Sequence, residues 1–296
     1  MSEPVVIFRS TRRAASEERA LVLAAVGISA AIGIDADGYV LHVAAEDAGR
    51  ALTQLTLYER EQPPPKRPAA PAYHYPGAWL GCMLYVLVLV GVAGAISRGL
   101  GRLDAFSTGE LAAARVQAGQ WWRAWTALTL HVGPAHLLGN LGGGVWFGYL
   151  ASRQIGPGTA WLLIVTGAAA ANLIEALTGP PMHSAVGAST AVFTALGLMA
   201  AYSWRRRLEY PQRWAVRWAP LVAGVALLAA TGVGDASGTD GTDLVGHALG
   251  FVVGVACGLM AAQPRLTAWL RRVPQWIPGV LALAQLAVAW SLALAS

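Results

Sequence analysis

The segment HVGPAHLLGN, residues 131–140, leads into an apolar run that continues to residue 151. Two histidines and an asparagine stand at the edge of this run, where an unpaired polar side chain is costly if lipid surrounds it. The whole chain shares this apolar character: of 296 residues, 55% are hydrophobic and 12% charged, and the mean hydropathy is +0.49. Such a composition is too apolar for an ordinary soluble domain and favours a membrane protein with several helical spans.

Seven apolar runs follow a proline-rich segment. They cover roughly residues 79–96, 135–151, 160–178, 186–204, 218–233, 244–262 and 277–295. Several are shorter than the ~20 residues that a full crossing needs, and many contain glycine, so we expect closely packed helices. We therefore predict an all-α polytopic membrane region, residues 78–296, with about seven transmembrane helices.

Residues 1–62 have a different pattern, in the order strand, helix, hairpin, helix. The four segments are residues 5–10, 12–27, 31–44 and 46–61. This order predicts a small cytoplasmic α+β domain of βαββα type. Six prolines between residues 63 and 77 predict a semi-extended linker between this domain and the membrane region.

The distribution of Lys and Arg predicts the orientation. If the amino-terminal domain is cytoplasmic, eleven basic residues of the membrane region and linker lie on that side and four lie outside. The eleven are Lys66, Arg67, Arg153, Arg205, Arg206, Arg207, Arg213, Arg217, Arg265, Arg271 and Arg272; the four are Arg98, Arg102, Arg115 and Arg123. The positive-inside rule then places the amino terminus in the cytoplasm. Anionic lipid accounts for the net charge of +5, so no nucleic-acid partner is expected. The alanine- and arginine-rich composition favours a bacterial cytoplasmic (inner) membrane.

Three sets of polar residues are expected to lie at a similar depth in the membrane. The second, fourth and sixth runs all enter from outside and carry His136 with Asn140, Ser189, and His247 in their first turns, roughly 5–10 Å below the surface. Because an imidazole can take a serine's proton, Ser189 is a candidate nucleophile and His247 a candidate base. His136 and Asn140 share one helix face and, with the backbone of Ser189, are candidate oxyanion donors.

Three glycines fit this arrangement. Gly187, just before the serine, allows substrate and backbone to approach closely. Gly250 and Gly254 form a stripe of small residues on the sixth run, along which the fourth could pack tightly enough to bring Ser189 and His247 together.

These motifs together resemble the rhomboid family of intramembrane serine proteases. The resemblance spans residues 79–262 and rests on GQWWRAWTALTLHVGPAHLLGN, on GAS around Ser189, and on the HxxGxxxG that starts at His247. It implies a rhomboid-like six-helix core with a Ser189–His247 dyad, to which the seventh run adds a C-terminal helix. His136 and Asn140 would assist the oxyanion.

The resemblance also implies roles for further residues. Trp122 and Arg123 would lie in a lipid-facing first external loop, and Phe193 would pack on the catalytic histidine. One departure is Thr190, where the family usually has the last glycine of GxSG, and this could alter the pocket beside the nucleophile.

A metal site at His131 and His136 is not favoured. No HExxH is present, and the nearest carboxylates, Asp104 and Glu110, lie upstream. We therefore expect no metal and no cofactor, and we expect His131 to hydrogen-bond to the external loop.

Two acidic residues leave alternatives open. Asp243 lies one helical turn before His247 and could orient its imidazole as the acid of a triad does, whereas the family resemblance implies a dyad. Glu175, near the outer end of the third run, is expected to be an interfacial or helix-packing residue rather than a catalytic acid.

The predicted function is an intramembrane serine endopeptidase whose partners are transmembrane protein substrates and membrane lipids. One alternative is a non-catalytic rhomboid-like protein that binds membrane clients; another is a small transporter that uses its histidines for protons. The sequence leaves open the substrate and its cleavage site, the role of the amino-terminal domain and the oligomeric state.

Overall fold

The computed structural model describes residues 3–61, 74–99, 104–207, 214–232 and 243–296. The chain divides into two compact units, residues 1–68 and 69–296, and the division falls within the predicted linker, 63–77. Most of this linker lies outside the described residues, as do four of the basic residues used for orientation: Lys66, Arg67, Arg102 and Arg213.

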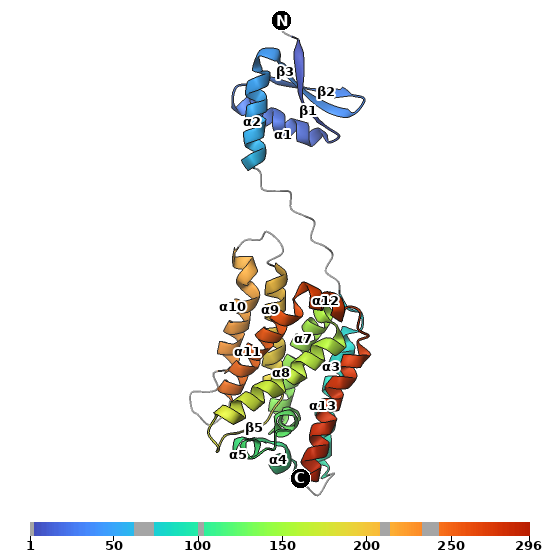
Figure 1. Ribbon diagram of the computed structural model, residues 1–296, viewed down its shortest axis with the longest axis vertical. Helices are drawn as coiled ribbons and strands as arrows, with labels where there is room; N and C mark the ends of the chain where they lie inside the picture. The colour runs from blue at the N-terminus through green and yellow to red at the C-terminus, as the bar shows by residue number, and fades with distance from the viewer. Residues whose placement is uncertain (1–2, 62–73, 100–103, 208–213, 233–242) are drawn as a thin grey trace. The chain divides into compact units, whose positions relative to one another are not determined.

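The amino-terminal unit has the predicted βαββα order (Figure 1). Its elements are β1 (Pro4–Ser10), α1 (Arg13–Ala25), β2 (Ala30–Asp35), β3 (Gly38–Ala44), a 3₁₀ turn η1 (Ala45–Asp47) and α2 (Ala48–Glu61). The sheet is antiparallel with the strand order β1-β3-β2. Leu23, Leu41 and Leu55, from α1, β3 and α2, are buried in one core between helices and sheet.

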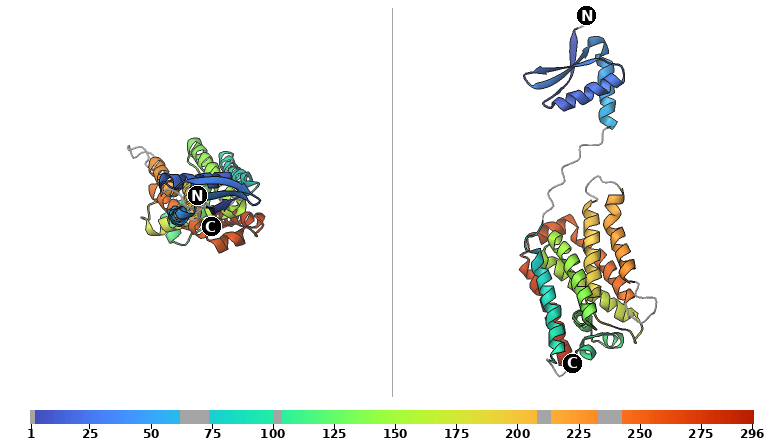
Figure 2. Two further views of the ribbon diagram at one scale, coloured as in Figure 1. Left: turned by 90° about the horizontal axis from the view of Figure 1, so that it is seen from above. Right: turned by 180° about the vertical axis from the view of Figure 1, so that it is seen from behind.

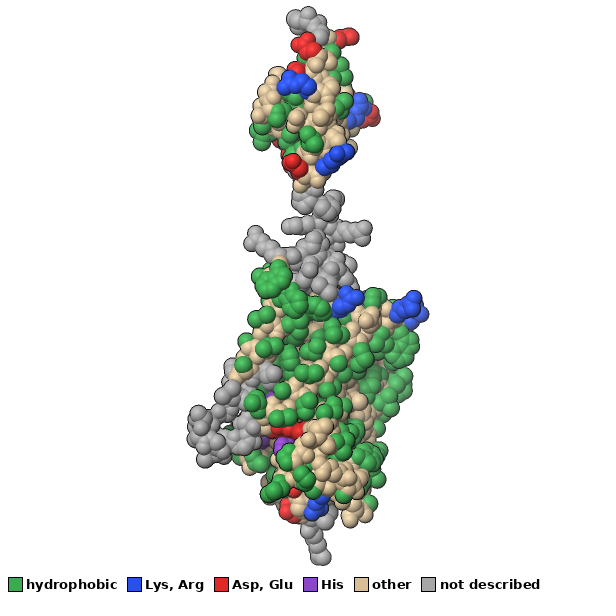
Figure 3. Space-filling model, turned by 60° about the vertical axis from the view of Figure 1, so that its left-hand side comes forward, with side chains coloured by type: hydrophobic (Ala, Val, Ile, Leu, Met, Phe, Trp, Pro, Cys, Tyr) green, Lys and Arg blue, Asp and Glu red, His purple; other side chains and the backbone are tan. Residues whose placement is uncertain are grey.

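Seven long helices of the second unit coincide with the seven apolar runs (Figure 1). They are α3 (Ala78–Ser97), α7 (Pro134–Ile155), α8 (Pro157–Thr178), α9 (Ser189–Arg207), α10 (Trp214–Gly232), α11 (Leu244–Ala261) and α13 (Trp276–Ala295). Among the described residues, four of these helices are long and apolar enough to cross a membrane: α3, α8, α11 and α13. Together with the largely hydrophobic surface over the helices, this gives a multi-pass membrane protein (Figure 3).

Short elements fill the connections between the long helices, and the connection from α3 to α7 holds most of them. It contains α4 (Ala105–Gly109), β4 (Leu111–Ala112), α5 (Ala113–Gln117), α6 (Arg123–Thr126) and a 3₁₀ turn η2 (Ala127–Thr129). The strand β4 pairs with β5 (Ser184–Ala185), which follows α8, and α12 (Pro264–Leu270) joins α11 to α13. The α3–α7 connection is thus a folded structure tied to the segment that leads into α9.

The helix α9 lies at the centre of the second unit, where it packs against α7, α8, α10 and α11. The helix α3 packs on α7, and α13 packs on α8 at the outer side of this group (Figure 2). Small residues dominate the buried core between these helices, among them Ala151, Ala160, Ala168 and Ala195. Such side chains let helix backbones approach closely in a membrane, as the glycine content of the sequence predicts.

Candidate active site

Ser189 is the first residue of α9, and two hydrogen bonds hold the loop before it. The amide of Gly187 donates to the carbonyl oxygen of Ala127 at 2.9 Å, and the amide of Ala188 donates to Nε2 of His131 at 3.3 Å. Gly187 has a φ of +133°, a conformation that favours glycine. The loop therefore presents the serine at a fixed position.

The backbones of α9 and α11 touch through glycines. A Cβ added to Gly250 would lie 2.7 Å from the carbonyl oxygen of Thr190, and a Cβ added to Gly254 would overlap a carbonyl of α9 one turn later. No side chain larger than hydrogen fits at either position without separating the helices. This contact brings the first turn of α9, with Ser189, against the first turns of α11, which carry His247.

The ring of His247 lies against Phe193, with the ring centroids 4.4 Å apart, which is the contact that the family resemblance implies. His247 is 8% exposed, and its Nδ1 has no hydrogen-bond partner among the described residues. The carboxylate of Asp243 accepts instead from the backbone amide of Gly246 at 2.8 Å and so caps α11. In this structure the side chain of Asp243 caps the start of α11 and makes no hydrogen bond to the imidazole of His247.

His136 and Asn140 lie on one face of α7 and approach the loop before the serine. A Cβ added to Gly187 would lie 2.8 Å from Nε2 of His136 and 3.5 Å from Nδ2 of Asn140. Asn140 is 6% exposed, and its Nδ2 has no hydrogen-bond partner among the described residues. Its backbone carbonyl accepts from the hydroxyl of Tyr85 at 2.8 Å. The side-chain amide of Asn140 is thus a buried donor without a hydrogen-bond partner among the described residues, and it lies beside the loop that leads to Ser189.

His131 supports the loop in its neutral form. Burial, and to a lesser extent the neighbouring His136, lower the pKa of His131 from 6.5 to about 4. The ring centroids of His131 and His136 are 5.1 Å apart, and the rings are arranged edge to face. Because Nε2 of His131 accepts from the amide of Ala188, this nitrogen must carry no proton.

Arg123 lies in the α3–α7 connection, but its side chain points into that connection and away from the surface. Arg123 is 1% exposed, and its guanidinium donates to Gln120 Oε1 at 2.6 Å and to the carbonyl oxygens of Glu110 and Ser107, both at 2.9 Å. Each of these partners belongs to the α3–α7 connection, so Arg123 holds that connection together. The neighbouring Trp122 is half-buried, and its indole nitrogen has no partner among the described residues.

A small pocket opens beside the serine. Its wall includes Gly187, Ser189, Thr190, Asn172 and Asp243. The side chain of Thr190 is 4% exposed and its methyl group lies against Gly250, so the departure from the family's glycine fills space at the α9–α11 contact.

A cluster of polar residues that includes Asp243 adjoins this pocket, and the sequence did not indicate it. Glu175 and His183 lie close to Asp243, although they precede it by 68 and 60 residues along the chain. Glu175 was expected to be an interfacial or helix-packing residue, and His183 was not singled out. The N-cap position of Asp243 does have a sequence signal, because Asp is favoured directly before a helix.

The candidate nucleophile, base and oxyanion donors all lie within the range that matches a known family. Residues 118–264 match the family model of the rhomboid domain, a range that runs from the α3–α7 connection to the end of α11. Searches of curated proteins and of solved structures found no match. By its domain, this chain belongs to the rhomboid family.

Proposed function

We propose that this protein is an intramembrane serine endopeptidase that cleaves a peptide bond in or beside the transmembrane segment of a membrane protein. Membership of a family of intramembrane proteases supports this function. The observation that carries it is the backbone contact of Thr190 with Gly250, since this contact joins the helix turns that bear Ser189 and His247.

The proposed reaction is acyl transfer in two steps. The Oγ of Ser189 attacks the scissile carbonyl carbon while His247 takes the hydroxyl proton. The tetrahedral intermediate collapses, the C–N bond breaks, and His247 gives the proton to the leaving amine. Water, deprotonated by His247, then hydrolyses the acyl-enzyme and releases the second product.

The oxyanion of the intermediate needs hydrogen-bond donors. The Nδ2 of Asn140 suits this role because it is buried, lies near Gly187 and makes no hydrogen bond to the described residues. His136, from the same helix face, and the backbone amide of Ser189 complete the proposed donor set. Preorganised donors of this kind stabilise developing charge without having to reorient during the reaction.

The function requires a substrate that reaches the site from the membrane. We take α7, α9 and α10 to cross the bilayer along with the four helices that are apolar enough by composition. With the amino terminus in the cytoplasm, Ser189 and His247 then lie near the outer face of a bacterial inner membrane. Transmembrane segments that unwind easily would be preferred, because an intact helix hides its scissile carbonyl.

The test is cleavage of a tethered single-span reporter by purified protein in lipid vesicles. We expect Ser189→Ala and His247→Ala to lower cleavage at least about a thousandfold. Ser203→Ala is the matched control, because Ser203 lies at the other end of α9 and bonds to Gln154. A fluorophosphonate should label the parent and the control but not Ser189→Ala.

Cleavage by Ser189→Ala at the parent's rate would show that this serine is not the nucleophile. If the parent neither cleaves the reporter nor reacts with the fluorophosphonate, the protein is not a serine protease, and a client-binding function takes its place.

A further inference from the structure

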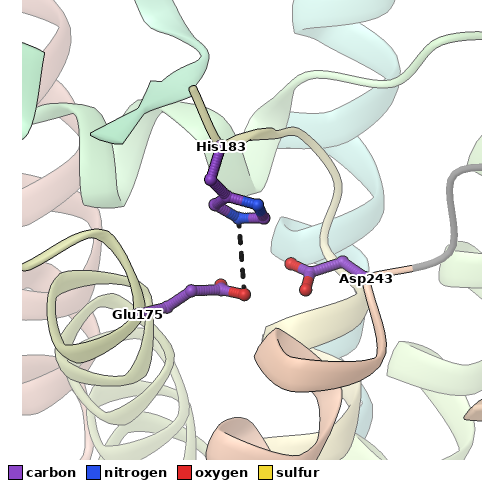
Figure 4. A group of neighbouring side chains, drawn as sticks. All are labelled: Glu175, His183 and Asp243. Atoms are coloured by element: carbon purple, nitrogen blue, oxygen red, sulfur yellow. Dashed lines mark ion pairs between the residues drawn. The ribbon is translucent and has the colours of Figure 1, made fainter. Parts of the chain in front are cut away.

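Glu175, His183 and Asp243 form a cluster beside the first turn of α11. They come from the end of α8, from the segment before β5 and from the N-cap of α11, and their side chains point toward one another (Figure 4). One ligand-type atom from each residue lies within 4.8 Å of the other two. The Nε2 of His183 is 3.4 Å from Oε1 of Glu175.

Glu175 is buried without the partners that a carboxylate needs. It is 3% exposed, and neither of its carboxylate oxygens accepts a hydrogen bond from the described residues. The contact between Nε2 of His183 and Glu175 is within ion-pair distance but does not have hydrogen-bond geometry, and this nitrogen has no hydrogen-bond partner among the described residues. Two carboxylates this close repel each other strongly at low dielectric unless positive charge lies between them.

The backbone of Gly246 lies directly against the two carboxylates of the cluster. A Cβ added to Gly246 would overlap the carboxylate of Asp243 and lie 2.8 Å from Oε2 of Glu175. The amide of Gly246 donates to one oxygen of Asp243, so the carboxylate is held in place. His183 is fixed as well, because its amide donates to Pro180 and its carbonyl accepts from Ala113. Three potential ligands are therefore preorganised on separate, well-anchored segments.

We propose that Glu175, His183 and Asp243 bind one divalent transition-metal ion of the Zn²⁺ class. A tetrahedral zinc site with bonds of ~2.1 Å places its ligand atoms roughly 3.4 Å apart, which equals the distance from Glu175 to His183. The longest separation in the cluster, up to 4.8 Å, contracts by about 1.4 Å on binding. One imidazole and two carboxylates suit Zn²⁺, whereas Ca²⁺ takes six to eight oxygen ligands and Mg²⁺ prefers an octahedron of oxygens.

The ion would join three segments that surround the candidate active site. Asp243 caps α11, and its backbone carbonyl accepts from the amide of His247 at 3.1 Å. A cation on Asp243 thus fixes the helix turn that bears His247 to α8 and to the segment before α9. This is a structural role, and it does not depend on whether the protein cleaves peptide bonds.

The experiment measures zinc binding to the full chain with a Ser189→Ala substitution and no histidine tag. The protein is stripped with EDTA in detergent and titrated with Zn²⁺ alone, and bound metal is counted after dialysis. We expect one zinc per chain, and at least about tenfold weaker binding in Glu175→Gln, His183→Gln and Asp243→Asn. Glu110→Gln and His74→Gln are the matched controls, because they remove a carboxylate and an imidazole elsewhere and should bind zinc like the parent.

Two further readouts separate ligation from unfolding. Zinc should raise the melting temperature of the Ser189→Ala protein and of both controls, but not that of Glu175→Gln, which replaces a buried charge with a neutral side chain of the same shape. Co²⁺ should give the intense visible absorption of a tetrahedral site, and this absorption should be lost in His183→Gln.

Equal zinc binding by the parent and Glu175→Gln would overturn the proposal. So would the absence of stoichiometric zinc in the parent, in which case a proton shared by Glu175 and Asp243 holds the cluster together. Tighter binding of Ca²⁺ or Mg²⁺ than of Zn²⁺ would also contradict it.

Discussion

Two helix interfaces of the membrane unit are built on different principles. Between α9 and α11, Gly250 and Gly254 face carbonyl groups directly, so the fit of the two backbones sets the distance between the helices. Between α13 and its neighbours, side chains make the bonds: the indole of Trp125 donates to Gln285 at 2.9 Å, and that of Trp290 donates to Thr129 at 3.1 Å. Glycine-to-backbone contacts thus set the interface that aligns the candidate catalytic residues, whereas the α13 interface combines one such contact, Gly158 against Gln275 and Gly279, with hydrogen bonds between side chains.

The largest effect is expected for Gly254→Ala, which tests the α9–α11 interface. The new methyl group overlaps the carbonyl of Thr194, and a backbone group cannot move aside as a flexible side chain can. We expect the free energy of unfolding to fall by about 3 kcal/mol and cleavage to fall at least tenfold, measured by thermal unfolding in detergent and by the reporter assay.

The control for this variant is Gly142→Ala on α7, where an added Cβ meets nothing within 4 Å. It should keep the parent's stability. If Gly254→Ala is as stable as Gly142→Ala, the two interfaces do not differ in the way described here.

A smaller effect is expected for Gln285→Leu at the α13 interface. The change removes the acceptor for Trp125 and the bond from Nε2 of Gln285 to Thr166, which is 3.0 Å long. We expect a loss of about 1–3 kcal/mol in unfolding free energy, because the indole N–H is left without a partner. Cleavage by the folded protein should stay close to that of the parent, since α13 carries no proposed catalytic group.

Ser291→Ala serves as its control, because that hydroxyl bonds only to Ala287 on its own helix and is exposed. A Gln285→Leu protein that melts like Ser291→Ala would mean that the polar bonds of α13 contribute nothing measurable. Loss of cleavage in a folded Gln285→Leu protein would mean that α13 shapes the active site directly.

A third effect concerns pH and the loop that leads into α9. The pKa of His131 is lowered from 6.5 to about 4, so the folded state favours the neutral ring more than the unfolded state does. The resulting stability is complete above pH 6.5 and is lost as the pH falls from 6.5 toward 4. The melting temperature of the parent should therefore fall more steeply over this range than that of His131→Gln, whose amide oxygen can still accept from Ala188.

Exposed His74 gives the control: His74→Gln should follow the pH profile of the parent. Parallel profiles for the parent and His131→Gln would show that the bond to Ala188 does not respond to protonation. Such a result would leave the glycine contacts of α9 with α11, and the bond from the amide of Gly187 to Ala127, as pH-independent supports of the candidate site.

Much of the fold could be predicted from periodicity, because helices and strands bury residues at fixed spacings. The βαββα order and the seven long helices follow from such patterns. Among the described residues, four helices meet a strict hydropathy criterion; glycines in α7 and arginines at the end of α9 lower the average hydropathy of those two helices. The Ser189, His247, His136 and Asn140 site was predicted from residue types at one depth, and its catalytic role stays a proposal.

The sequence prediction falls short where contacts depend on the tertiary fold. A sequence containing Trp-Trp-Arg is typical of a membrane surface, but the carbonyl groups that bind the Arg123 guanidinium come from a fold that periodicity does not reveal. The cluster of Glu175, His183 and Asp243 was missed for the same reason. Its members belong to three segments, and only tertiary packing brings them together.

The bonds of α13 also bear on the order in which the protein is assembled during synthesis. Gln285 lies 160 residues after Trp125, and Trp290 lies 161 residues after Thr129. At about 5–20 residues per second, roughly 8 to 30 s pass before a ribosome delivers these partners. The α9–α11 pair is complete as soon as α11 has been made, so the helices that bear Ser189 and His247 can dock first. Trp125 and Thr129 of the α3–α7 connection then lack these partners until α13 has been made.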